Sequence, residues 1–191
     1  MRSLKSYREL MQNVHDAHAL SKEAFREIGS WKSKDEKAVT KARELLDTFK
    51  EHSKSLDVRI TPLINTLRPG NEHVIDEVLE FLAVDVLAFG CGYAKEKCYR
   101  RLKHVELSSS HIGRIKDIAL RRCASNEYRR DDRELRRLVA KIADLEFLEK
   151  LTAIPAHDGS RAAGHKERMI RAVLDGRKDL RDELKRRASK T

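Results

Sequence analysis

Proline, glycine and aromatic residues are scarce in this sequence. Its 191 residues include three prolines, eight glycines and only 5% aromatic residues. With so few helix breakers, long stretches consist of Ala, Leu, Glu, Lys and Arg, which have strong helix preference. The hydrophobic share of 40% and the charged share of 38% together are typical of amphipathic helices and exclude a disordered chain. We therefore expect an all-α protein.

Long apolar runs are also missing. No run approaches the roughly 20 residues that a membrane span requires, and the first residues, MRSLKSYREL, lack the hydrophobic core of a signal peptide. Cysteine is limited to Cys91, Cys98 and Cys123, an odd number without a paired framework, which is typical of a reducing compartment. These absences predict an intracellular, cytoplasmic protein with free, buried thiols and no membrane partner.

Acidic residues are depleted only in the second half of the chain. The net charge of +10 results from 41 Lys and Arg against 31 Asp and Glu. Residues 1–99 hold 16 of each sign, so residues 100–191 hold the other 25 basic and 15 acidic residues. Arginine outnumbers lysine there by 17 to 8, and arginine is the better residue for bidentate contact with phosphate or carboxylate.

The first part of the chain predicts a helical hairpin. Apolar positions in alternating steps of three and four form a seam comprising Leu4, Tyr7, Met11, Val14, His18, Ser21, Phe25 and Ile28. Gly29 predicts the end of this helix, Trp31 is expected in the turn, and Ser33 with Glu36 predicts a capping box for a second helix that ends before Pro62. Residues 1–67 are therefore expected to form an antiparallel hairpin with a connecting turn that packs on the body.

Residues 71–153 are expected to form a helical body. Asn71 predicts the N-cap of a helix through residues 74–89 that is apolar on nearly all sides, as in the centre of a fold. Further helices are expected at Cys91–Lys103, after a cap at Ser108–Ser110, and as one or two helices from Asp131 onward.

Residues 154–191 predict a polar loop and one basic helix from about His165 to Arg187. The predicted fold is an N-terminal hairpin plus stacked helix pairs, as a helical bundle or a short array. The pairs resemble HEAT-type repeats in length and alternation alone.

The stretch AFGCGYAKEKC, residues 88–98, carries the densest group of reactive residue types. A dinucleotide fingerprint would need a glycine at Lys95, and a phosphate loop would need Gly-Lys-Ser/Thr. Cys91 and Cys98 are two helical turns apart, too far for a disulfide within one helix, and the neighbouring histidines match no compact zinc spacing. We expect a bend between helices, with no metal and no cofactor.

Two residues of the first helix are candidate catalytic residues. Arg8 and His15 have the Arg-x4–6-His spacing that resembles HEPN-type RNases, whose Arg and His act on an RNA phosphodiester. Arg68 and His73 also have this spacing, but Pro and Gly place them in a loop. A metal site at His15 and His18 is not expected, because His18 falls on the apolar seam.

Arginines of the second half are candidate nucleic-acid contacts, because stacked helices could align them along a phosphate backbone. The candidates are Arg100, Arg101, Arg121, Arg122, Arg129, Arg130, Arg133, Arg136, Arg137, Arg186 and Arg187. The alternative is a solvated surface of ion pairs, since Asp131, Asp132 and Glu134 neutralise part of the richest run.

No nucleophile, base and orienting group can be assembled from the sequence, so we expect a protein that is not an enzyme. The favoured function is a helical adaptor or assembly subunit that binds a protein partner. The first alternative is a sequence-nonspecific RNA- or DNA-binding protein, and the second is a metal-independent RNase. The neutral hairpin could instead mediate homo-oligomer formation.

Overall fold

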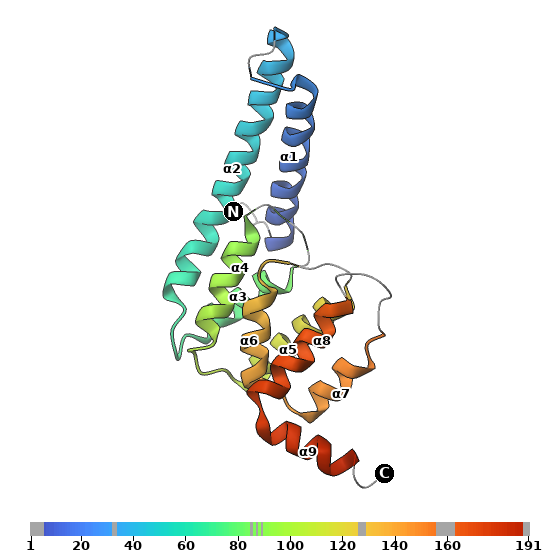
Figure 1. The fold of residues 1–191 in the computed structure, drawn as a ribbon. Helices are drawn as coiled ribbons and strands as arrows, with labels where there is room; N and C mark the ends of the chain where they lie inside the picture. Colours follow the sequence, from blue (N-terminus) through green and yellow to red (C-terminus); the bar gives the residue numbers. More distant parts are fainter. Residues whose placement is uncertain are drawn as a thin grey trace.

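The computed structural model describes residues 6–31, 34–84, 86, 88, 90–125, 129–155 and 163–188, and every regular element in these ranges is an α-helix (Figure 1). The helices are α1 (Tyr7–Ile28), α2 (Glu36–Thr66), α3 (Glu72–Ala83), α4 (Cys91–Leu102), α5 (Ser109–Ala124), α6 (Asp132–Ile142), α7 (Leu145–Ala153), α8 (Ala163–Gly176) and α9 (Lys178–Ala188). The predicted all-α class is confirmed. None of these helices combines the length and the apolar character needed to cross a membrane.

Helices α1 and α2 pack as an antiparallel hairpin whose free end projects from the body (Figure 1). Gly29, with φ of 63°, ends α1 as predicted, since this backbone conformation is available to glycine at little cost. The predicted cap Ser33 lies outside the described residues, and the N-cap of α2 is Asp35, whose side chain accepts a hydrogen bond from the Ala38 amide. The first turn of α2 is therefore capped two residues later than expected.

The apolar seam of α1 changes toward the free end of the hairpin. Its buried residues are Tyr7, Met11, Val14, Ala17, Ser21 and Ala24. The prediction that Phe25 continues the seam is wrong, because small alanines face α2 there and Phe25 is 41% exposed. Near its end the hairpin has only two helices, so a large side chain beside the seam has nothing to cover it.

The sequence predicts that the second helix ends before Pro62, but α2 does not end there. It continues through this proline to Thr66, with Leu56, Ile60 and Ile64 buried along one side. Proline disfavours a helix interior because it lacks an amide donor and its ring crowds the preceding turn. Burial of the apolar side evidently outweighs this cost, and α2 extends from the free end of the hairpin into the body.

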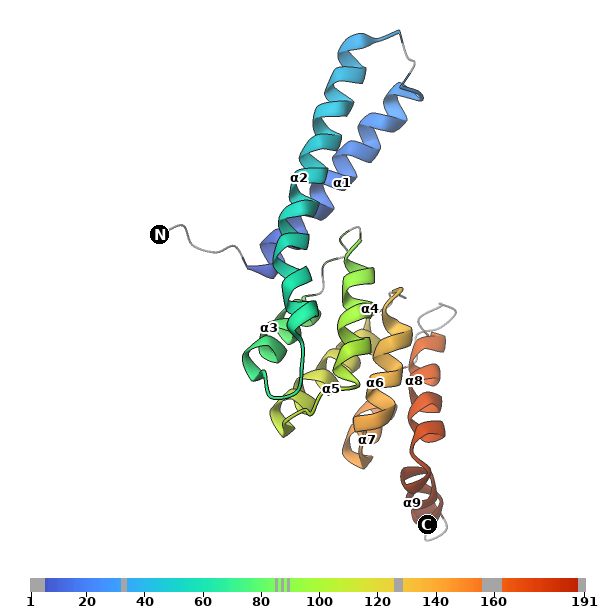
Figure 2. The same cartoon turned by 90° about the vertical axis from the view of Figure 1, so that its left-hand side faces the viewer.

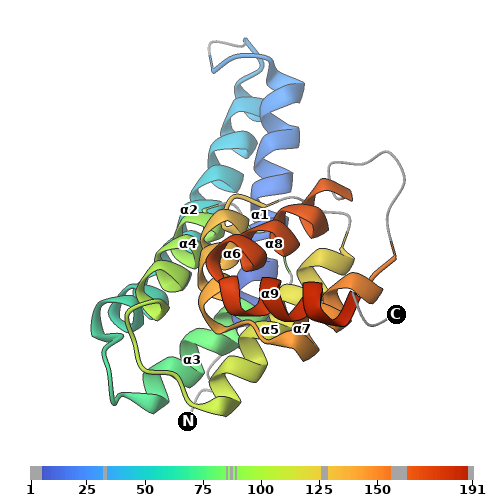
Figure 3. The same cartoon turned by 60° about the horizontal axis from the view of Figure 1, so that its bottom comes forward.

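The body consists of two layers of helices (Figures 2 and 3). Helices α4, α6 and α8 lie side by side in one layer, and α3, α5 and α7 form the other. The lower half of α2 packs against α4 and thereby adjoins the first layer. This is the predicted arrangement of stacked helix pairs.

Two predicted helices of the body have different limits. The central helix expected over residues 74–89 ends at Ala83, because Val84 is extended; residues 85, 87 and 89 lie outside the description. The basic C-terminal helix is two helices, separated at Arg177. The end of α8 is packed tightly, since a Cβ at Gly176 would lie 3.1 Å from Ala140 Cβ.

Local capping signals succeed elsewhere in the body. Ser108 and His111 form a reciprocal capping box at the start of α5. Asn71 occupies the N-cap of α3, although its side chain makes no capping hydrogen bond. Asp144 caps α7 by accepting a hydrogen bond of 2.9 Å from the Phe147 amide, which divides the segment after Asp131 into two helices.

Candidate functional site

The hairpin carries most of the large apolar side chains that the described residues expose. Four of the five belong to it: Leu20, Phe25, Trp31 and Val58. The fifth, Tyr93 on α4, lies beneath the Arg130 guanidinium, whose central carbon is 3.8 Å from the ring centroid. Uncovered apolar surface is thus concentrated on the hairpin.

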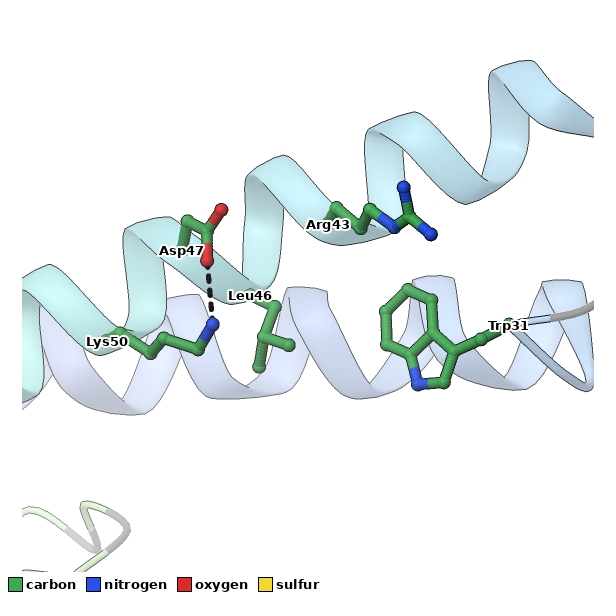
Figure 4. A pocket seen from close by; sticks show the side chains of 5 residues that line it. All are labelled: Trp31, Arg43, Leu46, Asp47 and Lys50. Carbon is green, nitrogen blue, oxygen red and sulfur yellow. Dashed lines mark hydrogen bonds and ion pairs between the residues drawn. The ribbon is translucent and has the colours of Figure 1, made fainter.

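Two aromatic rings meet at the free end of the hairpin. The ring centroids of Phe25 and Trp31 are 5.1 Å apart and their planes are inclined by 49°. Trp31 follows the turn at Gly29, and Figure 4 shows its indole directed back along the hairpin toward Arg43 and Leu46 of α2. The reversal at Gly29 therefore positions an aromatic residue of the loop over the second helix.

A cavity of about 330 Å³ adjoins this aromatic pair (Figure 4). Trp31 and Leu46 supply its apolar lining, while Arg43, Asp47 and Lys50 supply charged groups. The Lys50 Nζ contacts Asp47 Oδ1 at 2.8 Å, whereas Arg43 makes no ion pair with a described residue. An apolar centre with a charged edge is the usual composition of a protein-binding surface.

The histidine of the predicted seam packs inside the same hairpin. The ring centroids of His18 and Phe49 lie 5.2 Å apart. Burial lowers the pKa of His18, and the nearby Lys22 and His15 act in the same direction. His18 is thus a neutral packing residue at neutral pH. Among the described residues, no group of three or more His, Cys, Asp or Glu could hold a metal ion.

Two of the arginines predicted as nucleic-acid contacts are buried. Arg122 is 3% exposed and Arg129 is 7% exposed. Arg122 approaches Asp131 at 3.5 Å and Asp132 at 3.8 Å. These two arginines do not belong to an exposed basic face, because packing of the helices buries both and brings Asp131 and Asp132 to Arg122 inside the body.

Most of the other candidate arginines contact acidic side chains. Arg100 and Arg130 both contact Glu96, at 2.7 and 3.4 Å, and Arg137 contacts Glu134 at 2.6 Å. Arg186 and Arg187 both contact Glu183 on α9, and Arg136 is half-buried. Arg101, Arg121 and Arg133 are exposed, and none of the three forms an ion pair within the described ranges.

A group of ionisable residues that the sequence did not single out lies inside the body. Lys95, Asp131, Asp132 and His165 are each no more than 2% exposed, and they come from α4, from the start of α6 and from α8. The Lys95 Nζ donates hydrogen bonds to the backbone oxygens of Leu82 and Val84. We call these four residues the polar core.

Burial changes the proton affinities of the polar core. It lowers the pKa of Lys95 to about 8 and that of His165 to about 4, and it raises the pKa of Asp132 to about 6. In the sequence, the acidic pair Asp131-Asp132 directly follows the basic pair Arg129-Arg130, which suggests an exposed surface on which these opposite charges neutralise each other. The polar core joins helices of the body and has no exposed reactive group.

The candidate catalytic residues Arg8 and His15 are both exposed on α1. They are seven positions apart in the sequence, which corresponds to about 10 Å along a helix axis. Nothing in the structure tests the RNase prediction, which therefore stays a prediction. The thiols are buried as expected, and burial raises the pKa to about 11 for Cys91 and to about 12 for Cys98 and Cys123.

Comparison of the chain with protein-family models, with curated proteins and with solved structures finds no match.

Proposed function

We propose that the protein is a helical adaptor that binds a protein partner through the free end of its hairpin. The observation that carries this proposal is the exposed pair Phe25 and Trp31 beside a cavity at the end of a projecting element. Aromatic residues next to a pocket are typical binding hot spots, because they bury a large area with little loss of side-chain entropy.

The charges around the cavity indicate the chemistry of the partner. Arg43 is exposed and has no acidic partner in the described part of the chain, whereas Lys50 is already engaged by Asp47. A partner helix with an apolar side chain for the space between Trp31 and Leu46, and with an acidic residue facing Arg43, would complement this surface.

The test compares two double serine variants, each of which removes two large apolar side chains from the hairpin. In Trp31→Ser/Leu46→Ser the cavity loses its apolar lining, while Leu20→Ser/Val58→Ser removes exposed apolar groups elsewhere on the hairpin. Each protein is used to capture partners from its source cells, and circular dichroism verifies that helicity is unchanged. We expect a specific protein to be retained by the wild type and by the control pair but to be lost from the cavity variant.

Direct binding is then measured with the captured protein. Trp31 is the only tryptophan of the chain, so its emission reports on this surface alone. Burial by the partner should shift the emission to shorter wavelength. A shift that depends on the concentration of the chain alone would assign the surface to self-association, and equal capture by both variants would contradict the adaptor function.

A second candidate function, nucleic-acid binding, is favoured by cations on the three adjacent helices of one layer. The exposed basic residues there include Lys97 and Arg101 on α4, Arg133 and Lys141 on α6, and Arg171 on α8. Phosphate contacts release counterions, so affinity should fall by orders of magnitude between about 50 and 200 mM salt. Binding of labelled RNA and labelled duplex DNA at both concentrations tests this function, and no binding at low salt would contradict it.

A further inference from the structure

A basic groove lies between the hairpin and the body. A cavity of about 370 Å³ lies between side chains of the last turns of α2 and of the second half of α4. Thr61, Ile64 and Asn65 line it from α2, and Lys97, Arg100 and Arg101 line it from α4. Two elements that are distant in the sequence thus supply neutral hydrogen-bonding groups on one side and positive charge on the other.

The three cations of this groove have little acidic compensation. Arg100 contacts Glu96 at 2.7 Å, and Glu96 is shared with Arg130. Lys97 and Arg101 form no ion pair with any residue that the structure describes, and both are exposed. They are four residues apart on α4, a separation at which like charges destabilise a helix by about 0.2–0.5 kcal/mol. The stability of the fold therefore does not explain why Lys97 and Arg101 lie so close together.

The α2 side of the groove supplies hydrogen-bonding groups that the helix does not use. The hydroxyls of Thr40, Thr48 and Thr66 each donate to a backbone oxygen of the preceding turn, at 2.8, 3.0 and 2.9 Å. Thr61 is the remaining threonine of α2, and within the described chain its hydroxyl makes no such bond. Asn65, one turn later, is exposed and also lines the groove.

We propose that this groove binds a phosphate group. Arginine guanidinium groups hold phosphate oxygens in a bidentate manner, lysine adds a compact charge, and the Thr61 hydroxyl and the Asn65 amide donate hydrogen bonds from the opposite side. The bound phosphate would bridge α2 and α4. It is carried either by a nucleic-acid strand or by a small phosphate compound. This site is separate from the free end of the hairpin and does not depend on the adaptor function.

The first test uses the full chain and inorganic phosphate. Thermal unfolding is followed with phosphate or with chloride at equal ionic strength, for the wild type, for Lys97→Gln/Arg101→Gln and for the control Lys22→Gln/Lys41→Gln. The control removes the same charge from exposed positions of the hairpin. We expect phosphate to raise the unfolding midpoint of the wild type and of the control by several degrees, but not that of the groove variant.

The midpoints without phosphate distinguish a binding role from a structural one. Relief of like-charge repulsion predicts that Lys97→Gln/Arg101→Gln unfolds at the same or a higher temperature than the wild type at low salt.

A second groove variant, Asn65→Asp, keeps the side-chain shape and adds a negative charge. It should also abolish the phosphate effect. Equal phosphate effects in all proteins, or none in the wild type, would overturn the proposal.

The second test identifies what carries the phosphate. Affinity for a single-stranded RNA oligonucleotide is measured by fluorescence anisotropy between about 50 and 200 mM salt. If a strand occupies the groove, the slope of log affinity against log salt should fall by about 0.7 for each cation removed, so by about 1.4 in the double variant. An unchanged slope together with a lost phosphate effect assigns the groove to a small phosphate compound. Trp31→Ser/Leu46→Ser should keep the wild-type phosphate effect and the wild-type salt slope even if it no longer captures a protein partner.

Discussion

The Tyr7 hydroxyl donates a hydrogen bond of 2.7 Å to Glu77 Oε1 and thereby joins the base of the hairpin to α3. The Arg59 guanidinium lies 4.0 Å from the centroid of the Tyr7 ring and contacts the same Glu77 oxygen at 3.4 Å. Burial, together with the hydrogen bond to Glu77, raises the pKa of Tyr7 far above its usual value. The hydroxyl therefore stays a donor at every ordinary pH, and α1, α2 and α3 are held at one point.

Tyr7→Phe should remove this hydrogen bond with little change in packing. A hydrogen bond to a charged group contributes about 1.5–3 kcal/mol, so the free energy of unfolding should fall by roughly that amount. Urea denaturation measures the loss. Tyr93→Phe is the control, because Tyr93 is 55% exposed and its hydroxyl makes no hydrogen bond with a described residue. Equal stabilities of the two variants would show that the Tyr7 contact does not hold the hairpin.

The polar core predicts an unusual dependence of stability on pH. The His165 Nδ1 lies 4.0 Å from Asp132 Oδ2. Burial, with Arg136, Arg122 and Arg168 adding to it, lowers the pKa of His165 from 6.5 to about 4. Because the unfolded chain takes up this proton first, the stability linked to His165 is complete above pH 6.5 and is lost as the pH falls toward 4. Asp132, with its pKa raised to about 6, changes stability in the opposite sense over the same range.

Replacing His165 by Gln separates the two effects. One pKa unit corresponds to 1.36 kcal/mol, so the unfolding free energy of the wild type minus that of His165→Gln should fall by up to ~3 kcal/mol between pH 6.5 and 4. Urea midpoints across this range give the difference. His104→Gln, at an exposed position, should follow the wild type at every pH. A difference that does not depend on pH would mean that His165 titrates normally in the folded protein.

Features encoded by neighbouring residues could be predicted from the sequence. The helix end at Gly29 and the cap at Ser108 follow from local backbone preferences, and the structure has both. The limits of the longer helices depend on packing. Pro62 was expected to end α2, but buried neighbours on the same helix side sustain it.

Burial of charged residues could not be read from the sequence. Lys95 shares its helix side with Cys91 and Cys98, but a lysine is ordinarily expected to keep its charge in water. His165 begins a segment in which basic residues outnumber acidic ones. Each is buried because other helices of the body close over it. The candidate groove is similar, since Arg100 and Arg101 stood out as basic residues, whereas Thr61 and Asn65 lie more than thirty residues away and become relevant only through the packing of α2 on α4.

The three cysteines should be unreactive in the folded protein. All are buried, and burial raises the pKa of each thiol to about 11 or 12, so the nucleophilic thiolate is nearly absent at pH 8. With Ellman's reagent at pH 8, the native chain should release little colour over the time in which the chain in denaturant reports three thiols. A thiol that reacts rapidly in the native protein would mean that the body opens around it or that its environment is more polar than the structure indicates.

Pro62 should be replaceable by alanine with a gain in stability. Proline in a helix interior costs about 3 kcal/mol relative to alanine, because it removes one backbone hydrogen bond and crowds the preceding turn. In α2 the residue four positions earlier is Val58, which is 66% exposed, so alanine could restore the bond to its carbonyl oxygen without displacing a buried group. Pro62→Ala should therefore raise the urea midpoint, by an amount equivalent to about 1–3 kcal/mol.

Because Pro62 adjoins Thr61, the effect of phosphate on the unfolding midpoint should also be measured for Pro62→Ala and compared with that of the wild type. A stable variant that binds phosphate as before would show that the proline shapes neither the helix nor the groove, whereas a destabilised variant would show that α2 needs a proline at this position to pack against α4.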